Sequence, residues 1–251
     1  MRTILVTGGT GTLGRPTTAS LRAAGHDVRV LSRSSGPGLT TDDLTKATGL
    51  REALNGVDTV LHLSTSQRRA DVAQAQNLLE ALRPSGVEHL IVVSIVGVDR
   101  IPLPYYRYKL EMERLVDRSS IPYSLLRATQ FHDLVDKVFT AQRFLPLLLA
   151  PSIDLQPIAV DDVATRLTEL ADAQPAGRVP DIGGPEQRSV PDLARLWKQA
   201  AGSHRPVASI RLPGKAFRAF ATGAAMTGDT KYGQKTFTNY LTDRFATEVP
   251  R

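Results

Sequence analysis

The first fourteen residues, MRTILVTGGTGTLG, constrain the fold of this chain most. The apolar run over residues 3–7 predicts a buried strand, and residues 12–24 predict a helix that ends at Gly25. A glycine-rich loop joins the two. Free backbone N–H groups at the start of such a helix, together with the positive end of its dipole, attract phosphate groups. The segment therefore predicts a nucleotide-binding loop, and a plain tight turn is the alternative.

The glycines of this loop fit two overlapping patterns, Gly9-x-Gly11-x-x-Gly14 and the wider Gly8-x-x-Gly11-x-x-Gly14. One glycine permits the tight turn out of the strand, one lets the backbone approach a pyrophosphate, and Gly14 lets the helix pack closely. The threonines of the loop add hydroxyl donors. The predicted phosphate-side residues are Gly8, Thr10, Gly11, Thr12, Leu13 and Gly14.

Short apolar runs alternate with longer helical patterns through the first half of the chain. Strands are expected at residues 3–7, 27–31, 58–63, 89–94 and 123–126, and helices at 12–24, 47–54, 67–83 and 105–117. Nearly continuous apolar strands separated by helices indicate a parallel sheet that is covered on both faces. The expected fold class is α/β, a Rossmann-type doubly wound parallel sheet with a small C-terminal substrate-binding portion.

The pattern is less regular after about residue 130. Helices are expected at 131–140, 161–171 and 191–201, with Asp161 as the cap of the second, and strands at 178–182 and 207–212. Because no linker rich in Gly, Ser or Pro divides the chain, we expect one NAD(P)-binding domain over 1–251. Within it, residues 1–130 form the dinucleotide-binding core and 131–251 the C-terminal substrate-side portion.

Composition excludes several classes of function. The 31 basic and 25 acidic residues give a net charge of +6, but the charges are spread along the chain, so no nucleic-acid partner is expected. The longest apolar stretch, residues 144–150, is too short to span a membrane, and no signal peptide is visible. The chain has no cysteine, and its five histidines lack metal-ligand spacing, so no metal is expected. These features predict a cytoplasmic protein with a small-molecule substrate and leave the oligomeric state open.

The end of the second predicted strand favours one cofactor over another. An Asp or Glu at this position usually binds the ribose 2′-hydroxyl of NAD, but here the chain reads Ser32-Arg33-Ser34-Ser35. A guanidinium and hydroxyl donors suit a 2′-phosphate. Residues Ser32 and Arg33 therefore predict NADP(H), with NAD(H) possible. The alternative is that Arg33 is an ordinary solvated loop residue.

Several segments together resemble the NmrA-like branch of the short-chain dehydrogenase/reductase superfamily over roughly residues 1–200. They are TGGTGTLG at 7–14, GVDTVLHL at 56–63, SIVGVD at 94–99, the helix with Lys109 and Glu113, PYSLLR at 122–127 and DIGGPE at 181–186. The resemblance implies a Rossmann-type fold, an NAD(P) cofactor and a cleft at the carboxyl edge of the sheet. It places Asp43 and Leu44 near the adenine, Leu63, Ser64 and Thr65 along the cofactor, and Thr129, Gln130 and Phe131 near the nicotinamide.

Active members of that superfamily use a Tyr and a Lys four residues apart on one helix face, as Tyr105 and Lys109 are here. The Lys lowers the phenol pKa and holds the nicotinamide ribose, and the Tyr gives or takes a proton. The alternatives are a surface Lys109 paired with Glu113 and a Tyr105 that covers apolar surface in a loop. The usual catalytic Ser or Thr position holds Val96, on the substrate side, so Ser94 is expected to contact cofactor instead.

Two further predictions concern the pocket. His132 is expected to line the substrate site, with a surface position at a helix start as the alternative, whereas His62 is expected to be a satisfied core residue. Late aromatic residues, together with Met226, form either a pocket wall or ordinary core packing. These residues are Phe217, Phe220, Met226, Tyr232, Phe237 and Tyr240.

Three functions remain open at this point. The first is an NADPH-dependent oxidoreductase that transfers hydride to a small, partly apolar carbonyl, enone or quinone. The second is a non-catalytic redox sensor that binds NADP(H) and a protein partner, and the third is an epimerase or dehydratase that retains NAD. The presence of both Tyr105 and Lys109 favours an enzyme.

Overall fold

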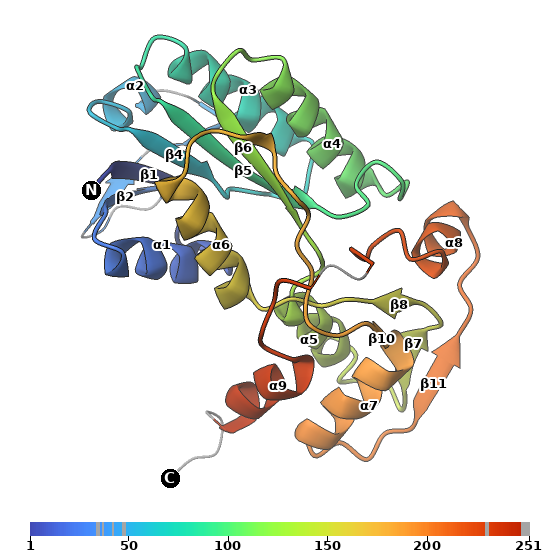
Figure 1. Ribbon diagram of the computed structural model, residues 1–251. Coiled ribbons are helices and arrows are strands. Elements are labelled where there is room, and N and C mark those ends of the chain that lie inside the picture. The colour runs from blue at the N-terminus through green and yellow to red at the C-terminus, as the bar shows by residue number, and fades with distance from the viewer. Residues whose placement is uncertain (34–35, 37, 42, 47–48, 229–230, 247–251) are drawn as a thin grey trace.

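A parallel sheet forms the upper part of the molecule, with strand order β3-β2-β1-β4-β5-β6-β9 (Figure 1). The computed structural model describes residues 1–33, 36, 38–41, 43–46, 49–228 and 231–246. The strand order of the sheet reverses direction between β1 and β4, which creates the switch point where doubly wound folds bind ligands. The strands are β1 (Thr3–Thr7), β2 (Asp27–Ser32), β3 (Leu39–Thr41), β4 (Thr59–His62), β5 (His89–Ile95), β6 (Tyr123–Ala128) and β9 (Gly177–Arg178).

Helices cover both faces of this sheet because its strands are apolar on both sides. Leu5 and Val60 pack in the core cluster with α2, α3 and α4, whereas their neighbours Ile4 and Leu61 pack in the cluster with α1 and α6. Alternate strand residues point to opposite faces, so a continuous apolar run serves both layers. The helices are α1 (Gly14–Ala23), α2 (Leu50–Ala53), α3 (Ala70–Leu82), α4 (Pro104–Asp117) and α6 (Val160–Asp172).

The C-terminal portion lies beyond the carboxyl edge of the main sheet (Figure 1). Its core contains Phe139, Leu193 and Phe237, and the buried Asp136 carboxylate accepts a hydrogen bond from Trp197 Nε1 at 2.7 Å. Two small sheets complete it, β7 with β11 and β8 with β10. The elements are α5 (His132–Thr140), β7 (Leu148–Pro151), β8 (Asp154–Leu155), β10 (Arg188–Ser189), α7 (Val190–Ala200), β11 (Val207–Ile210), α8 (Lys215–Ala221) and α9 (Phe237–Ala246).

The fold class expected from the sequence is confirmed, with corrections to element ends. The first helix begins at Gly14, so Thr12 lies in the loop. Residues 47–48 of the expected helix 47–54 lie outside the described residues, and α2 is a single turn. The expected strand 178–182 is shorter, because after β9 only Ile182 makes a further bridge, to Ala128.

Asp161 is not the cap of α6, because the helix begins at Val160 after Ala159. Asp161 and Asp162 instead lie in its first turn, where the helix dipole favours negative charge. The Asp162 carboxylate accepts hydrogen bonds from the backbone N–H groups of Gln234 and Lys235 at 2.9 and 3.2 Å. The prediction for Asp161 was wrong because the helix begins one residue earlier, at Val160, so that Asp161 is already a helical residue.

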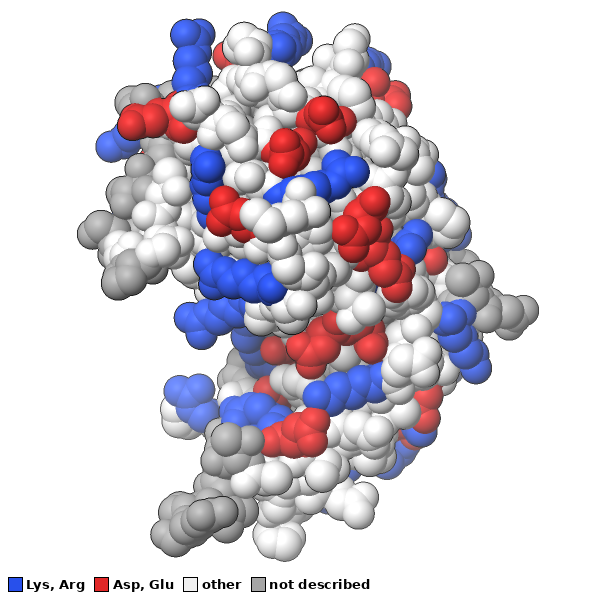
Figure 2. Space-filling model, turned by 60° about the vertical axis from the view of Figure 1, so that its left-hand side comes forward, with Lys and Arg blue, Asp and Glu red and all other residues white. Residues whose placement is uncertain are grey.

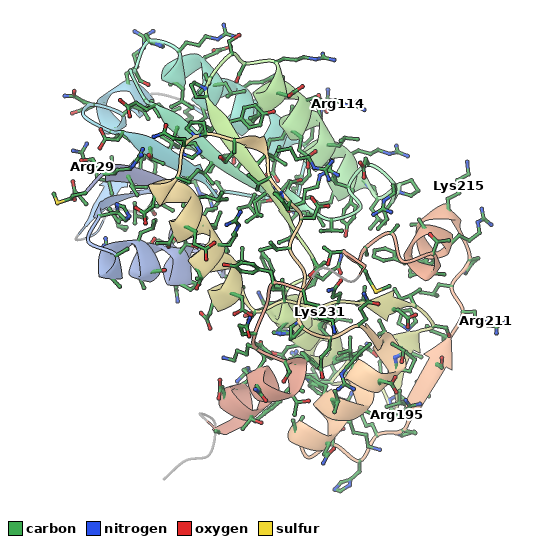
Figure 3. The ribbon with its side chains drawn as sticks, in the orientation of Figure 1. Arg29, Arg114, Arg195, Arg211, Lys215 and Lys231 are labelled. Carbon is green, nitrogen blue, oxygen red and sulfur yellow. The ribbon has the colours of Figure 1, made fainter. Side chains whose placement is uncertain are left out.

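Charged side chains of both signs are interspersed on the face that Figure 2 shows. The labelled Arg114, Arg211 and Lys215 project outward from different parts of the chain (Figure 3). The excess of basic residues is therefore dispersed over these surfaces. Over the part of the chain that the structure describes, no helix has the length and apolar character needed to cross a membrane.

Candidate cofactor and active site

The glycine loop after β1 folds back on its surroundings, and this explains two of its glycines. Gly8 has φ +71°, and a Cβ there would lie 2.7 Å from the backbone nitrogen of Ser64 after β4. A Cβ on Gly14 would overlap the Gly8 carbonyl oxygen. Gly11 is different, because it is exposed and its Cβ would meet only that same oxygen, at 3.2 Å. Gly8 and Gly14 therefore shape the loop, while Thr10, Gly11 and Thr12 form its open tip.

Two cations lie at this loop that the sequence analysis did not single out. Arg15 Nε donates to the Thr10 carbonyl at 2.9 Å, and Lys137 Nζ donates to Thr12 Oγ1 at 3.5 Å. Lys137 comes from α5 in the C-terminal portion. No spacing pattern in the sequence indicates this contact, because Lys137 lies 125 residues from Thr12 along the chain. Both parts of the protein thus supply positive charge where phosphates would bind.

The loops after β2 and β3 form the side of the site assigned to the adenosine. Arg33 is exposed directly after β2, while Ser34 and Ser35 lie outside the described residues. The Asp43 carboxylate accepts the Thr45 N–H at 2.9 Å, and this bond, aided by the charges of Arg33 and Lys46, holds the pKa of Asp43 below its usual value. Leu44 is buried, and its carbonyl accepts from the Asn77 side chain of α3 at 2.8 Å.

The segment after β4 connects the glycine loop to α3. The Ser64 N–H donates to Thr7 Oγ1 at 3.4 Å, and Ser64 Oγ donates to Gln74 at 3.3 Å. Gln74 in turn donates to Thr45 Oγ1 at 3.3 Å, so the loops after β3 and β4 are joined. Leu63 is half-buried and packs against the cluster beneath α1 and α6.

Two buried polar side chains, His62 and Ser94, lie at the carboxyl ends of β4 and β5. His62 Nδ1 is 2.9 Å from Thr7 Oγ1, and burial, with the nearby Lys109 charge, lowers the pKa of His62 to about 3. His62 is therefore a core residue but only half satisfied. Among the described residues, neither its Nε2 nor the buried Ser94 Oγ has a hydrogen-bond partner.

Lys109 is buried, which rules out the surface alternative. The residue is only 6% exposed, and its Nζ donates to the Val93 carbonyl at 3.2 Å. Burial lowers the pKa of Lys109, and the charges of Asp71 and Glu113 oppose that effect. Glu113 itself makes a two-bond pair with Arg127, at 2.9 and 2.6 Å.

Tyr105 lies on α4 rather than in a loop, as the second residue of the helix. Its half-buried hydroxyl is 3.3 Å from Thr65 Oγ1. Burial, with a contribution from Asp71, raises the pKa of Tyr105. This is opposite in direction to the lowered phenol pKa that the superfamily scheme implies, because burial has the largest effect on the Tyr105 pKa and the nearby Asp71 carboxylate adds to it.

The residues assigned to nicotinamide and substrate are mostly covered. Gln130 Nε2 donates to Tyr106 Oη at 3.4 Å, and Phe131 is half-buried beside it. Val96 and His132 are each only 1% exposed. The His132 ring packs against Phe237 and Tyr240 of α9, and its Nε2 contacts the Lys235 carbonyl at 3.0 Å. A direct contact of Val96 or His132 with substrate would therefore require the covering segments to move.

The late aromatic residues do not form one wall. Phe237 and Tyr240 stack in the C-terminal core, and Phe217 and Phe220 face each other on α8. Tyr232 packs near α6 and donates to Glu169 at 2.9 Å. Their separation into three clusters supports ordinary packing.

The residues present fit a dinucleotide. An exposed loop tip flanked by Arg15 and Lys137 suits the phosphates. At the same edge of the sheet, the buried Ser94 hydroxyl and His62 Nε2 have no hydrogen-bond partner among the described residues, so a polar ligand group could bind them. Over the described residues, no group of His, Asp and Glu side chains is arranged to hold a metal ion.

A seven-stranded doubly wound sheet with a glycine loop at its switch point defines a dinucleotide-binding α/β protein. Comparison with known families narrows this class. The profile of the NAD(P)H-binding family matches residues 8–174, and the chain belongs to this family.

Individual relatives are distant and differ in function. The chain is 26% identical over 234 residues to photosystem II assembly factor Ycf39 of Trieres chinensis, covering 83% of this chain and 72% of that one. It is 28% identical over 135 residues to quinone oxidoreductase 2 of Escherichia coli K12, covering 49% and 47%. The crystal structure of the NADPH-dependent quinone oxidoreductase QOR2 of Escherichia coli with NADPH matches 96% of this chain and 99% of that one, with a TM-score of 0.82 at 19% identity. That likeness shows the fold.

Proposed function

We propose that this protein is an NADPH-dependent reductase of a small, partly apolar carbonyl, enone or quinone, from the NmrA-like branch of its superfamily. The observation that carries the proposal is the placement of the Tyr105 hydroxyl. It lies at the carboxyl edge of the sheet, on the helix that also carries Lys109, and it contacts Thr65 in the segment that follows β4. A small-molecule substrate at this edge would have a proton donor beside the segment that follows β4.

The residues divide the work as follows. The tip residues Thr10, Gly11 and Thr12 would hold the cofactor phosphates, and Arg33 would meet the 2′-phosphate. Lys109 would orient the nicotinamide ribose. The bound nicotinamide supplies hydride when reduced. Tyr105, whose raised pKa keeps it protonated at neutral pH, would donate its hydroxyl proton to the substrate oxygen.

The decisive experiment is a survey of NADPH oxidation with quinones, enones and carbonyl compounds, comparing the wild type with Tyr105→Phe. Loss of the proton donor should lower kcat by roughly 10²–10⁴-fold with little change in NADPH affinity. Tyr123→Phe is the matched control, because it removes a hydroxyl at the start of β6, at the opposite edge of the sheet, where Tyr123 donates to Asp117 at 2.7 Å. Full turnover by Tyr105→Phe would show that this acid is wrong.

A second candidate is a non-catalytic NADP(H)-binding protein that acts on another protein. The similarity to an assembly factor favours it. In that case NADPH binds, yet none of the acceptors supports turnover above the rate without protein. The same survey therefore separates the two candidates.

A further inference from the structure

Asp71 is a buried carboxylate beside the proposed proton donor. It is the second residue of α3 and only 2% exposed. Its Oδ1 accepts from the N–H and the hydroxyl of Ser66, at 2.6 and 2.5 Å. Its Oδ2 accepts from Thr65 Oγ1 at 2.6 Å and from the Gln67 N–H at 3.2 Å. Four hydrogen-bond donors therefore converge on this carboxylate at the start of the helix.

These bonds hold the segment over residues 65–67 in an unusual shape. Gln67 has φ +59°, in the left-handed region that non-glycine residues rarely adopt. The segment is therefore wrapped onto Asp71, with Thr65 exposed at its surface and within reach of Tyr105. The strain is tolerated because the carboxylate binds three consecutive residues at once.

The hydrogen bonds fix the direction of the contact between Thr65 and Tyr105. An ionised carboxylate can only accept, so the single hydroxyl proton of Thr65 points to Asp71. Thr65 Oγ1 is then left with acceptor capacity, part of which the Gln67 N–H uses at 3.1 Å. The Tyr105 hydroxyl must therefore be the donor in its 3.3 Å contact with Thr65.

We propose that Asp71 is a positioning residue that, through the Thr65 hydroxyl, orients the Tyr105 hydroxyl as a donor and keeps it protonated between turnovers. This rests on the proposed reductase function. In reduction the substrate carbonyl carbon gains a hydride from the cofactor, and its oxygen gains the Tyr105 proton as the phenol O–H bond breaks. Water then returns a proton to the phenolate. The Asp71 charge and a Thr65 oxygen that can only accept both disfavour this phenolate, so Tyr105 regains its proton before the next turnover.

The geometry also explains how the proton leaves. A contact of 3.3 Å is long for two hydroxyls, and so it is weak. The Tyr105 proton can turn from Thr65 to a substrate oxygen with little loss, whereas the 2.6 Å bond from Thr65 to Asp71 persists. The hydrogen bond from Thr65 to Asp71 thus keeps its direction throughout turnover.

The test measures the ionisation of Tyr105 directly. Protein labelled with fluorotyrosine is titrated by fluorine NMR, and the Tyr105 signal is identified by its absence in Tyr105→Phe. Asp71→Asn removes the charge and lets an amide donate to Thr65, so the Tyr105 midpoint should fall by about one pH unit. Asp192→Asn is the matched control, because it makes the same change in the first turn of α7. An unchanged midpoint in Asp71→Asn overturns the proposal.

A second pair of variants covers the case in which Asp71→Asn does not fold. Thr65→Val removes the acceptor of the Tyr105 proton but leaves Asp71 its bonds to Ser66 and Gln67. The midpoint should fall by about half a pH unit, the worth of one hydrogen bond to the neutral phenol, and Thr65→Ser should restore it. A midpoint that stays or rises in Thr65→Val contradicts the proposal.

The titration needs no turnover, so the two proposals can fail separately. If no acceptor is reduced but Asp71→Asn shifts the midpoint, the positioning role stands and the reductase function falls. If the protein reduces a substrate and Asp71→Asn changes neither the midpoint nor the pH profile of kcat, Asp71 is only structural.

Discussion

Lowering the pH should destabilise this protein through His62. The folded pKa of about 3 lies below the unfolded value of 6.5, so the unfolded state binds more protons between them. The stability that the neutral ring provides is complete above pH 6.5 and is lost as the pH falls toward 3. At pH 5 the difference amounts to about 2 kcal/mol, or roughly 4–8 °C in Tm for a chain of this size.

Urea unfolding of wild type and His62→Gln at pH 7.5 and pH 5 tests this value. The variant lacks the titrating ring, so it should lose about 2 kcal/mol less between the two pH values. The buried His89, whose pKa is lowered to about 4, contributes equally to both proteins and cancels. His204→Gln is the matched control at an exposed histidine. A pH dependence of His62→Gln equal to that of wild type would refute the reasoning.

Three further predictions concern the cofactor-binding residues and the Arg127–Glu113 ion pair. Arg33→Ala should raise the Kd of NADPH far more than that of NADH by calorimetry, and equal effects would remove the NADP preference. Gly14→Ala should lower Tm because its Cβ overlaps Gly8, whereas Gly11→Ala should fold nearly normally and lose NADPH affinity. Arg127→Met should destabilise the fold by about 3–5 kcal/mol in urea, because it leaves the Glu113 charge buried and unpaired, and Arg127→Met with Glu113→Leu should recover most of that loss.

Interpretation of the sequence was most successful where structure depends on near neighbours. The apolar run over β1 and the glycines after it predict a strand, a turn and a helix start from about fourteen residues. The alternation of strands and helices through β6 likewise follows from local patterning. The same reasoning placed Tyr105 and Lys109 on one helix, because a spacing of four residues fixes their relation.

Interpretation was weakest in the C-terminal portion. Strands β8 and β10 have two residues each and exist only because they pair with one another. Such short strands have no periodicity that a sequence can show. Helix α9 forms part of a core that it shares with α5, α7 and β7, and the sequence alone left its aromatic residues open between a pocket wall and core packing.

By itself, therefore, the sequence determined the fold class and the glycine loop, because both depend on the order of residues along the chain. Only the tertiary structure brought Lys137 to the loop tip, paired Glu113 with Arg127, and placed Asp71 behind Thr65 and Tyr105. These contacts join residues from different elements across the carboxyl edge of the sheet. Their strength depends on distance, burial and hydrogen-bond direction, and none of these is a property of sequence spacing.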